Sequence, residues 1–194
     1  MKVLLLNGSP RKNGCTYTAL NVVADALKAE GIDAEVFQAG DPDMENVKAA
    51  AAKLKDSDAL VVLLEILRLL SISQLSPSGQ IIEFMDRLAS VAGKDMLYKP
   101  AAAVASARRA GTTATLDVLT KYFSYHQMPV VSSCYWNMVH GNTPEEVMKD
   151  EEGVQIMRVL GKNMAWLLKC IEAGKKNGVA VPAAEDKIKT NFIR

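Results

Sequence analysis

Residues 3–16 read VLLLNGSPRKNGCT, a run of four apolar residues followed at once by a loop of turn-forming and polar residues. A short continuous apolar run is typical of a central parallel strand that is covered on both faces. Beyond the loop, apolar residues recur at helical spacing at Leu20, Val23, Ala24 and Leu27. The stretch therefore predicts a strand, a loop and a helix, which is the first unit of an α/β domain.

The loop has the composition of a phosphate-binding loop. A helix that begins near Thr16 presents backbone N–H groups and the positive end of its dipole to the loop. Further hydrogen-bond donors are Ser9, Arg11, Asn13 and Thr16. The G-x-x-x-x-G-K-[ST] pattern is absent, because Cys15 stands in the lysine position, and so is the G-x-G-x-x-G fingerprint. The loop is predicted to hold a monophosphate group; the alternative is a polar turn without a ligand.

Strands and helices continue to alternate along the chain. Further strands are predicted at 34–38, 59–64, 101–105 and 129–132, and further helices at 44–54, 80–88, 115–125 and 152–173. Thr143 and Glu146 form a capping box for another helix start, with Pro144 at the first helical position. This order predicts a doubly wound, five-stranded parallel sheet in a three-layer α/β/α arrangement, as a single domain over residues 1–194.

Composition and charge narrow the class of protein. Hydrophobic residues make up 49% of the 194 residues and charged residues 23%, which is usual for a globular protein. The net charge of +1 predicts neither a nucleic-acid nor a membrane partner. The apolar stretch 59–70 contains Glu65 and Arg68 and is too short to cross a bilayer. Three widely spaced cysteines, at 15, 134 and 170, argue against a disulfide framework and predict a cytoplasmic protein.

The loops resemble those of a known family. Residues 4–20, LLLNGSPRKNGCTYTAL, are similar to the first loop of the flavodoxin-like NAD(P)H-dependent FMN reductase family, whose N-G-S-P-R-x-x-G-x-[ST] motif holds the flavin phosphate. Residues 103–117, AVASARRAGTTATLD, resemble the loop that reaches the isoalloxazine ring, and the similarity continues through 128–144 and the last helix. The resemblance implies that FMN is bound by Ser9, Arg11, Asn13, Gly14, Cys15 and Thr16 at its phosphate, and by Ser106, Ala107, Arg108, Arg109, Gly111, Thr112 and Thr113 around its ring.

The resemblance also implies an activity. The chain is expected to be an FMN-binding oxidoreductase, a flavoprotein that takes electrons from NAD(P)H and reduces a small acceptor: a quinone, a nitro or azo compound, or free flavin. No catalytic side chain is expected, because the flavin carries the chemistry. Arg108 and Arg109 can compensate negative charge on the reduced flavin or hold a phosphate of the nicotinamide cofactor; the alternative is a solvated loop with incidental charge. The family precedent implies a homodimer.

Two neighbouring segments depart from the family. Residues 38–44, QAGDPDM, stand where many relatives carry a cysteine cluster, so the chain resembles the iron–sulfur-flavoprotein branch without that cluster, and no metal is expected. Residues 63–75, LLEILRLLSISQL, replace a G-[ST]-P-x-Y turn that flanks the flavin in relatives. The alternative function is therefore a non-catalytic flavodoxin-like scaffold, or an engineered variant, in which the rebuilt 38–75 region has lost or altered flavin binding.

Five side chains outside the two predicted loops have either several possible roles or a structural one. Tyr135 and Trp136 either stack near a flavin, pack across a dimer interface or lie in the core. His140 either hydrogen-bonds a substrate or caps a turn, whereas His126 is interpreted as structural or partly exposed. Neither histidine has metal-ligand spacing. Cys170 is predicted to lie in the core.

Overall fold

The computed structural model describes residues 1–65, 78–183, 185, 186, 188 and 190. The strands are β1 (Lys2–Asn7), β2 (Asp33–Gln38), β3 (Ala59–Glu65), β4 (Ala101–Ala107) and β5 (Met138–His140). The helices are α1 (Cys15–Ala29), α2 (Met44–Lys55), α3 (Gly79–Met96), α4 (Thr112–Tyr125), α5 (Pro144–Lys149) and α6 (Glu151–Lys176). The leucine-rich segment that replaces the family's turn lies outside the described residues from 66 to 75.

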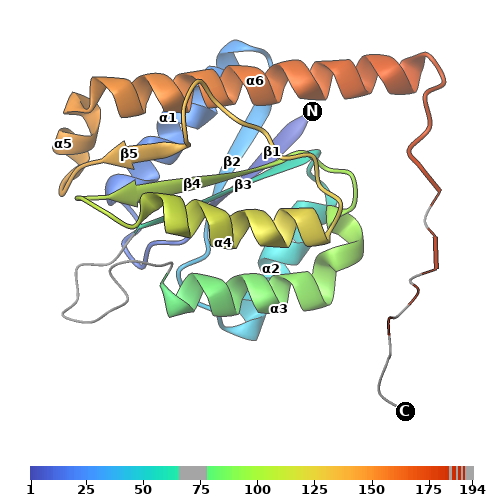
Figure 1. The fold of residues 1–194 in the computed structure, drawn as a ribbon, viewed down its shortest axis with the longest axis horizontal. Helices are drawn as coiled ribbons and strands as arrows, with labels where there is room; N and C mark the ends of the chain where they lie inside the picture. The colour runs from blue at the N-terminus through green and yellow to red at the C-terminus, as the bar shows by residue number, and fades with distance from the viewer. Residues whose placement is uncertain (66–77, 184, 187, 189, 191–194) are drawn as a thin grey trace.

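All five strands are parallel and lie in the order β2-β1-β3-β4-β5. In Figure 1, α1, α5 and α6 cover one face of this sheet and α2, α3 and α4 cover the other. Alternate residues of β1 serve the two cores: Val3 and Leu5 face α1 and α6, whereas Leu4 and Leu6 face α2 and α3. The predicted doubly wound, three-layer fold is confirmed. Because the strands are parallel, the loops that follow them all lie at one rim of the sheet.

The prediction of the fifth strand at 129–132 is wrong. Val130 forms only an isolated bridge with Ala101, after which the chain leaves β4 and pairs with it again at Met138–His140. Across the gap, the side-chain amide of Asn137 donates to the carbonyl oxygen of Ala103 at 3.0 Å, where a strand would have offered a backbone N–H. A side-chain hydrogen bond thus satisfies the Ala103 carbonyl oxygen, which has no strand partner where the edge strand is interrupted.

Most other boundaries agree with the predictions to within a few residues. The helix predicted at 80–88 is longer, running to Met96 with a break in helical geometry at Ala92 (φ −129°, ψ 16°). The predicted cap at Thr143 is present, with its hydroxyl accepting from the backbone N–H of Glu146 at 3.3 Å. Cys170, predicted in the core, is exposed, because α6 turns a different face toward the sheet. Among the described residues, no helix is both long enough and apolar enough to cross a bilayer.

Helix α6 packs directly against α1 at Gly161. A Cβ atom built on this glycine would stand 2.7 Å from the Cβ of Ala26 and 2.9 Å from the carbonyl oxygen of Val23. Real side chains do not approach this closely, so the two helix backbones meet where only glycine fits. This contact holds α1, and therefore the loop before it, against the long last helix.

The β2 edge of the sheet is tied down by charge. The Glu35 carboxylate accepts hydrogen bonds from Lys2 on β1, at 2.6 Å, and from Lys53 on α2. These hydrogen bonds lower the pKa of the Glu35 carboxyl. The edge strand is thus linked both to its neighbouring strand and to the helix that covers it.

Candidate functional site

The loop between β1 and α1 begins as a continuation of the sheet. The backbone N–H of Gly8 donates to the carbonyl oxygen of Leu63 on β3 at 2.8 Å. A Cβ atom on Gly8 would lie 3.0 Å from the side chain of Ile81 and 3.1 Å from that carbonyl oxygen. The chain therefore turns out of β1 in close contact with its neighbours, and a larger residue than glycine would require the Ile81 side chain or the loop to shift.

The rest of this loop is wound around the side chain of Asn7, which is fully buried. Its Oδ1 accepts from the backbone N–H of Ser9 at 3.2 Å, an Asx-turn contact. Its Nδ2 donates to Gln38 Oε1 at 2.8 Å and to the carbonyl oxygens of Arg11 and Lys12 at 3.4 Å each. Asn7 is not among the predicted site residues. An asparagine between an apolar run and Gly-Ser was the signal that could have found it.

Helix α1 begins at this loop, and its N-terminal turn has neither a side-chain cap from its N-cap residue, Gly14, nor an acidic residue. Thr16 in that turn is fully buried, and its hydroxyl has no hydrogen-bond partner among the described residues. A buried unpaired hydroxyl costs about 1–3 kcal/mol. The orphaned hydroxyl and the uncapped helix end both fit an anionic group such as a phosphate.

The other residues of the predicted phosphate site differ in how far they are buried. Arg11 and Asn13 are exposed on the loop, whereas Ser9 is buried and its hydroxyl accepts from the backbone N–H of Arg11 at 3.1 Å. The Cys15 side chain is buried in the core, with its sulfur 3.8 Å from the carbonyl oxygen of Gly141. A contribution of Cys15 to a ligand would therefore come from its backbone.

The second predicted loop follows β4. Arg108 and Arg109 are exposed, and among the described residues neither guanidinium has an ion-pair partner. Gly111, the N-cap of α4, adopts φ +96°, a conformation that favours glycine. Two hydroxyls here, those of Ser106 and Thr115, are buried and also lack a partner in the described part of the chain. Ala107 and Thr112 are buried, and Thr113 is exposed.

The end of β5 joins the two loops. The backbone N–H of Gly141 donates to the carbonyl oxygen of Ala107 at 3.2 Å, and the same glycine's carbonyl oxygen faces Cys15. The His140 ring places Nε2 3.2 Å from the carbonyl oxygen of Arg109, and its backbone N–H donates to Asp150 at 2.7 Å. The two predicted loops therefore lie side by side at the rim where the strands end, the side to which the β4 arrow points in Figure 1.

Tyr135 and Trp136 are not in the core. They are 52% and 59% exposed, and their rings form a T-shaped pair with centroids 4.9 Å apart. They line a cavity of about 460 Å³ between the interrupted edge strand and α4. Stacking on a ligand and packing against a partner remain their two interpretations.

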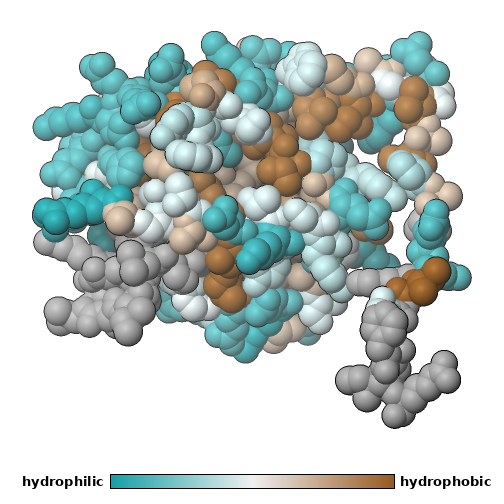
Figure 2. All heavy atoms as spheres, in the orientation of Figure 1, coloured by the Kyte–Doolittle hydropathy of each residue, from teal (hydrophilic) through white to brown (hydrophobic). Residues whose placement is uncertain are grey.

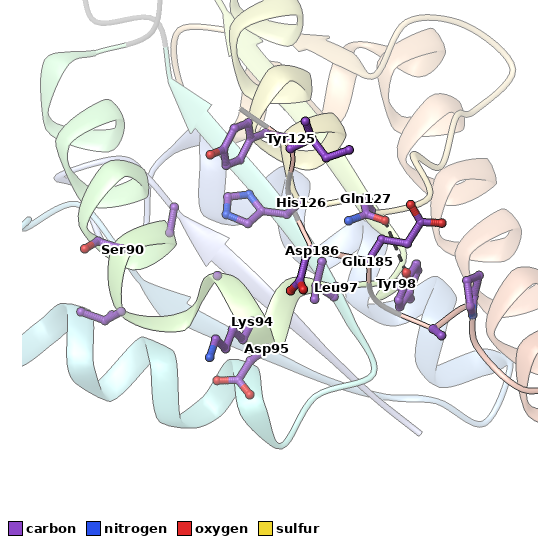
Figure 3. A pocket seen from close by; sticks show the side chains of 16 residues that line it. Ser90, Lys94, Asp95, Leu97, Tyr98, Tyr125, His126, Gln127, Glu185 and Asp186 are labelled. Atoms are coloured by element: carbon purple, nitrogen blue, oxygen red, sulfur yellow. Dashed lines mark hydrogen bonds between the residues drawn. The ribbon is translucent and has the colours of Figure 1, made fainter. Parts of the chain in front are cut away.

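His126 lies at the opposite end of the sheet. Figure 3 shows it in a cavity of about 1310 Å³ with Ser90 and Lys94 of α3, close to the start of β4. Its Nδ1 lies 2.8 Å from the carbonyl oxygen of Tyr122, and the side chain is buried. This contact agrees with the structural interpretation of His126, and the cavity contains none of the predicted site residues.

The sequence of this chain is similar to those of flavoproteins. A family model described as NADPH-dependent FMN reductase matches residues 1–143. An iron–sulfur flavoprotein of Methanocaldococcus jannaschii is 26% identical over 204 residues, covering 89% of this chain and all of the relative.

Solved structures share the fold. A WrbA-like flavodoxin from Agrobacterium tumefaciens has a TM-score of 0.65 at 15% identity, and the alignment covers 87% of this chain and 97% of that one. The flavoenzyme NAD(P)H:(acceptor) oxidoreductase FerB from Paracoccus denitrificans has a TM-score of 0.64 at 16% identity, with the same coverage of both chains. At these identities the likeness to solved structures concerns the fold alone.

Proposed function

Because the chain belongs to the NADPH-dependent FMN reductase family, we propose that it holds FMN at the rim of the sheet and passes electrons from NAD(P)H to a small acceptor. The family and flavodoxin-like fold predicted from the sequence are confirmed, and the chain is a flavin-dependent oxidoreductase. The observation that carries the proposal is the buried hydroxyl of Thr16, which finds no hydrogen-bond partner in the described chain and lies in the first turn of α1, where the N-cap makes no side-chain hydrogen bond.

The chain's own residues divide the work of binding. The phosphate is assigned to the first turn of α1, with the Thr16 hydroxyl and the Arg11 guanidinium as donors, and with Ser9 and the backbone of Asn13, Gly14 and Cys15 around it. The ring is assigned to the loop 106–113, where Arg108 and Arg109 supply positive charge. When bound, FMN supplies the hydride and electron chemistry. The protein binds, orients and compensates charge, and no catalytic side chain is assigned.

The acceptor is proposed to be a quinone, a nitro or azo compound, or free flavin. The exposed guanidiniums of Arg108 and Arg109 support a nicotinamide dinucleotide as donor, since its phosphates are anionic and arginine binds phosphate well. The non-catalytic scaffold is the disfavoured alternative. In the described part of the rebuilt region, the Gln38 side chain accepts a hydrogen bond from Asn7, at the start of the first loop.

A homodimer in the cytoplasm is the proposed state of the protein, with residues 1–194 acting as one flavodoxin-like domain. Figure 2 shows apolar atoms exposed between α6 and α4, on the side crossed by the interrupted edge strand. Val130, Tyr135 and Trp136 of this segment are about half exposed, which supports contact with a second copy. All three cysteines are free thiols, which supports a reducing compartment.

We expect the purified protein to bind FMN and to bleach its visible absorbance when NADPH is added. Binding is measured by the quenching of flavin fluorescence, and reduction by the loss of the flavin absorbance band under anaerobic conditions. Riboflavin, which lacks the phosphate, is expected to bind at least about tenfold more weakly, because a charged hydrogen bond contributes about 1.5–3 kcal/mol. Equal affinity for the two flavins would contradict the phosphate site, and binding without bleaching would favour the scaffold.

We expect Arg11→Ala to weaken FMN binding by about tenfold, the lower end for a charged hydrogen bond, because Arg11 is exposed. Lys12→Ala is the matched control. Both residues are exposed and both give their carbonyl oxygens to Asn7, so both substitutions leave these backbone contacts in place. Fluorescence titration at two salt concentrations measures the effect. An Arg11 variant that binds FMN no more weakly than the Lys12 variant would remove Arg11 from the phosphate site.

A further inference from the structure

The first loop is held from behind by a residue of the neighbouring strand, Gln38, the last residue of β2. We propose that Gln38 is a positioning residue: it fixes the loop in its phosphate-binding shape without contacting the ligand itself. The inference rests on the proposed function and deepens it, because it assigns part of the preference for a phosphorylated flavin to a residue behind the site.

The amide of Gln38 connects two parts of the loop. Its Oε1 accepts from Asn7 Nδ2 at 2.8 Å, and its Nε2 donates to the carbonyl oxygen of Ser9. Both polar ends of the side chain are thus used within the protein, one on each side of the turn from β1. These contacts define the orientation of the Gln38 amide. In the reverse orientation, Nε2 would face the Asn7 Nδ2 donor and Oε1 would face the Ser9 carbonyl oxygen, so neither hydrogen bond could form.

Gln38 is itself held in place by α2. Its carbonyl oxygen accepts from Asn46 Nδ2 at 3.2 Å, and the same Nδ2 donates to the carbonyl oxygen of Asp41 at 2.8 Å. The backbone N–H of Ala39 donates to the carbonyl oxygen of Asn7 at 2.8 Å, and Asp43 caps the first turn of α2. The brace therefore runs from the capped end of α2 through Gln38 to the loop.

The backbone after Gln38 also presses on the loop. A Cβ atom on Gly40 would stand 2.5 Å from the carbonyl oxygen of Ser9 and 2.8 Å from Gln38 Nε2. Only glycine allows this approach. The Ser9 carbonyl is thus enclosed between the Gln38 amide and the Gly40 backbone.

The arrangement matters for phosphate binding because the loop must place several donors around one small anion. Both backbone polar groups of Ser9 are committed: its N–H to Asn7 and its carbonyl oxygen to Gln38. Removing the Gln38 amide leaves the Ser9 carbonyl and the Asn7 amide each short of a partner. The loop would then have to be ordered by the ligand, at a cost in affinity that a preorganised loop avoids.

The test compares FMN with riboflavin in Gln38→Ala and Gln38→Glu. The glutamate keeps an acceptor for Asn7 and loses the donor to Ser9. Both variants are expected to bind FMN at least about tenfold more weakly while riboflavin affinity changes less than about twofold, since only the phosphate uses the loop. Gln155→Ala, at an exposed position of α6, is the control and is expected to match the wild type.

A second pair of variants tests the same inference by steric means. Gly40→Ala pushes on the Ser9 carbonyl and is expected to reduce the preference for FMN over riboflavin about as much as the Gln38 variants do. Gly79→Ala is the control, because no atom of the described residues lies within 4 Å of its added Cβ atom.

The outcomes separate the inference from the proposed function. A wild type without preference for FMN over riboflavin would overturn both. A wild-type preference that persists unchanged in the Gln38 and Gly40 variants would overturn the inference alone. Equal losses for both flavins, with a lower melting temperature, would make Gln38 a structural residue and also overturn it.

Discussion

Thr16→Val is expected to lower the affinity for FMN by about tenfold to a hundredfold and, in the absence of ligand, to make the protein more stable. Valine keeps the shape of threonine and lacks the hydroxyl, which is buried and has no partner among the described residues. Removing an unpaired buried hydroxyl raises the free energy of unfolding by about 1 kcal/mol, whereas removing a donor to a phosphate weakens binding. Urea unfolding of the apoprotein and FMN titration measure the two effects.

Thr115→Val is the matched control for this experiment. Its hydroxyl is also fully buried and unpartnered in the described chain, but it lies on α4, across the sheet from α1. We expect the same gain in stability and no change in the ratio of FMN to riboflavin affinity. A Thr16 variant that loses stability, or that keeps full FMN affinity, would show that this hydroxyl serves the fold and not the ligand.

Gly161→Leu is expected to lower the free energy of unfolding by about 3 kcal/mol, the upper part of the usual range for overpacking. The added side chain would start 2.7 Å from the Cβ of Ala26 and 2.9 Å from a backbone oxygen of α1, so relief requires the two helices to separate. Urea unfolding followed by circular dichroism gives the difference.

Gly174→Leu, on the same helix, controls for the loss of a glycine. Among the residues that the structure describes, its Cβ atom would meet only Val179, at 3.6 Å, which is ordinary contact. We expect a change below about 1 kcal/mol there. Equal effects at the two positions would show that α1 and α6 do not meet as described.

The sequence predicts the fold well where burial leaves a simple pattern. The runs in β1, β3 and β4 are continuous and apolar because each strand is covered on both faces. The prediction put the fifth strand in the wrong place because 129–132 and 138–140 are both short and partly apolar. Which of the two segments pairs with β4 depends on backbone hydrogen bonds to β4 and on the side-chain amide of Asn137. Neither contact leaves a periodic pattern in the sequence.

The site divides in the same way. The rule that ligands bind at the carboxyl ends of parallel strands correctly predicts that the loops of 8–14 and 108–111 lie together. The burial of the Cys15 thiol in the core was not predicted, although Cys15, Ala19 and Val23 share one buried helical face. The role of Gln38 could not be predicted from the sequence. It depends on a contact with Asn7, 31 residues away, and therefore on which strands become neighbours in the sheet.

The interruption of the edge strand has a consequence for aggregation. An exposed edge with a long row of unpaired backbone groups is a template on which other chains can add strands. Here β5 offers three residues, and the Asn137 amide already occupies the Ala103 carbonyl behind the gap. On the opposite edge, β2 carries the charged Asp33 and Glu35. Neither edge of this sheet therefore offers a long uncharged row of backbone groups, which disfavours the addition of a strand from another copy at these two edges.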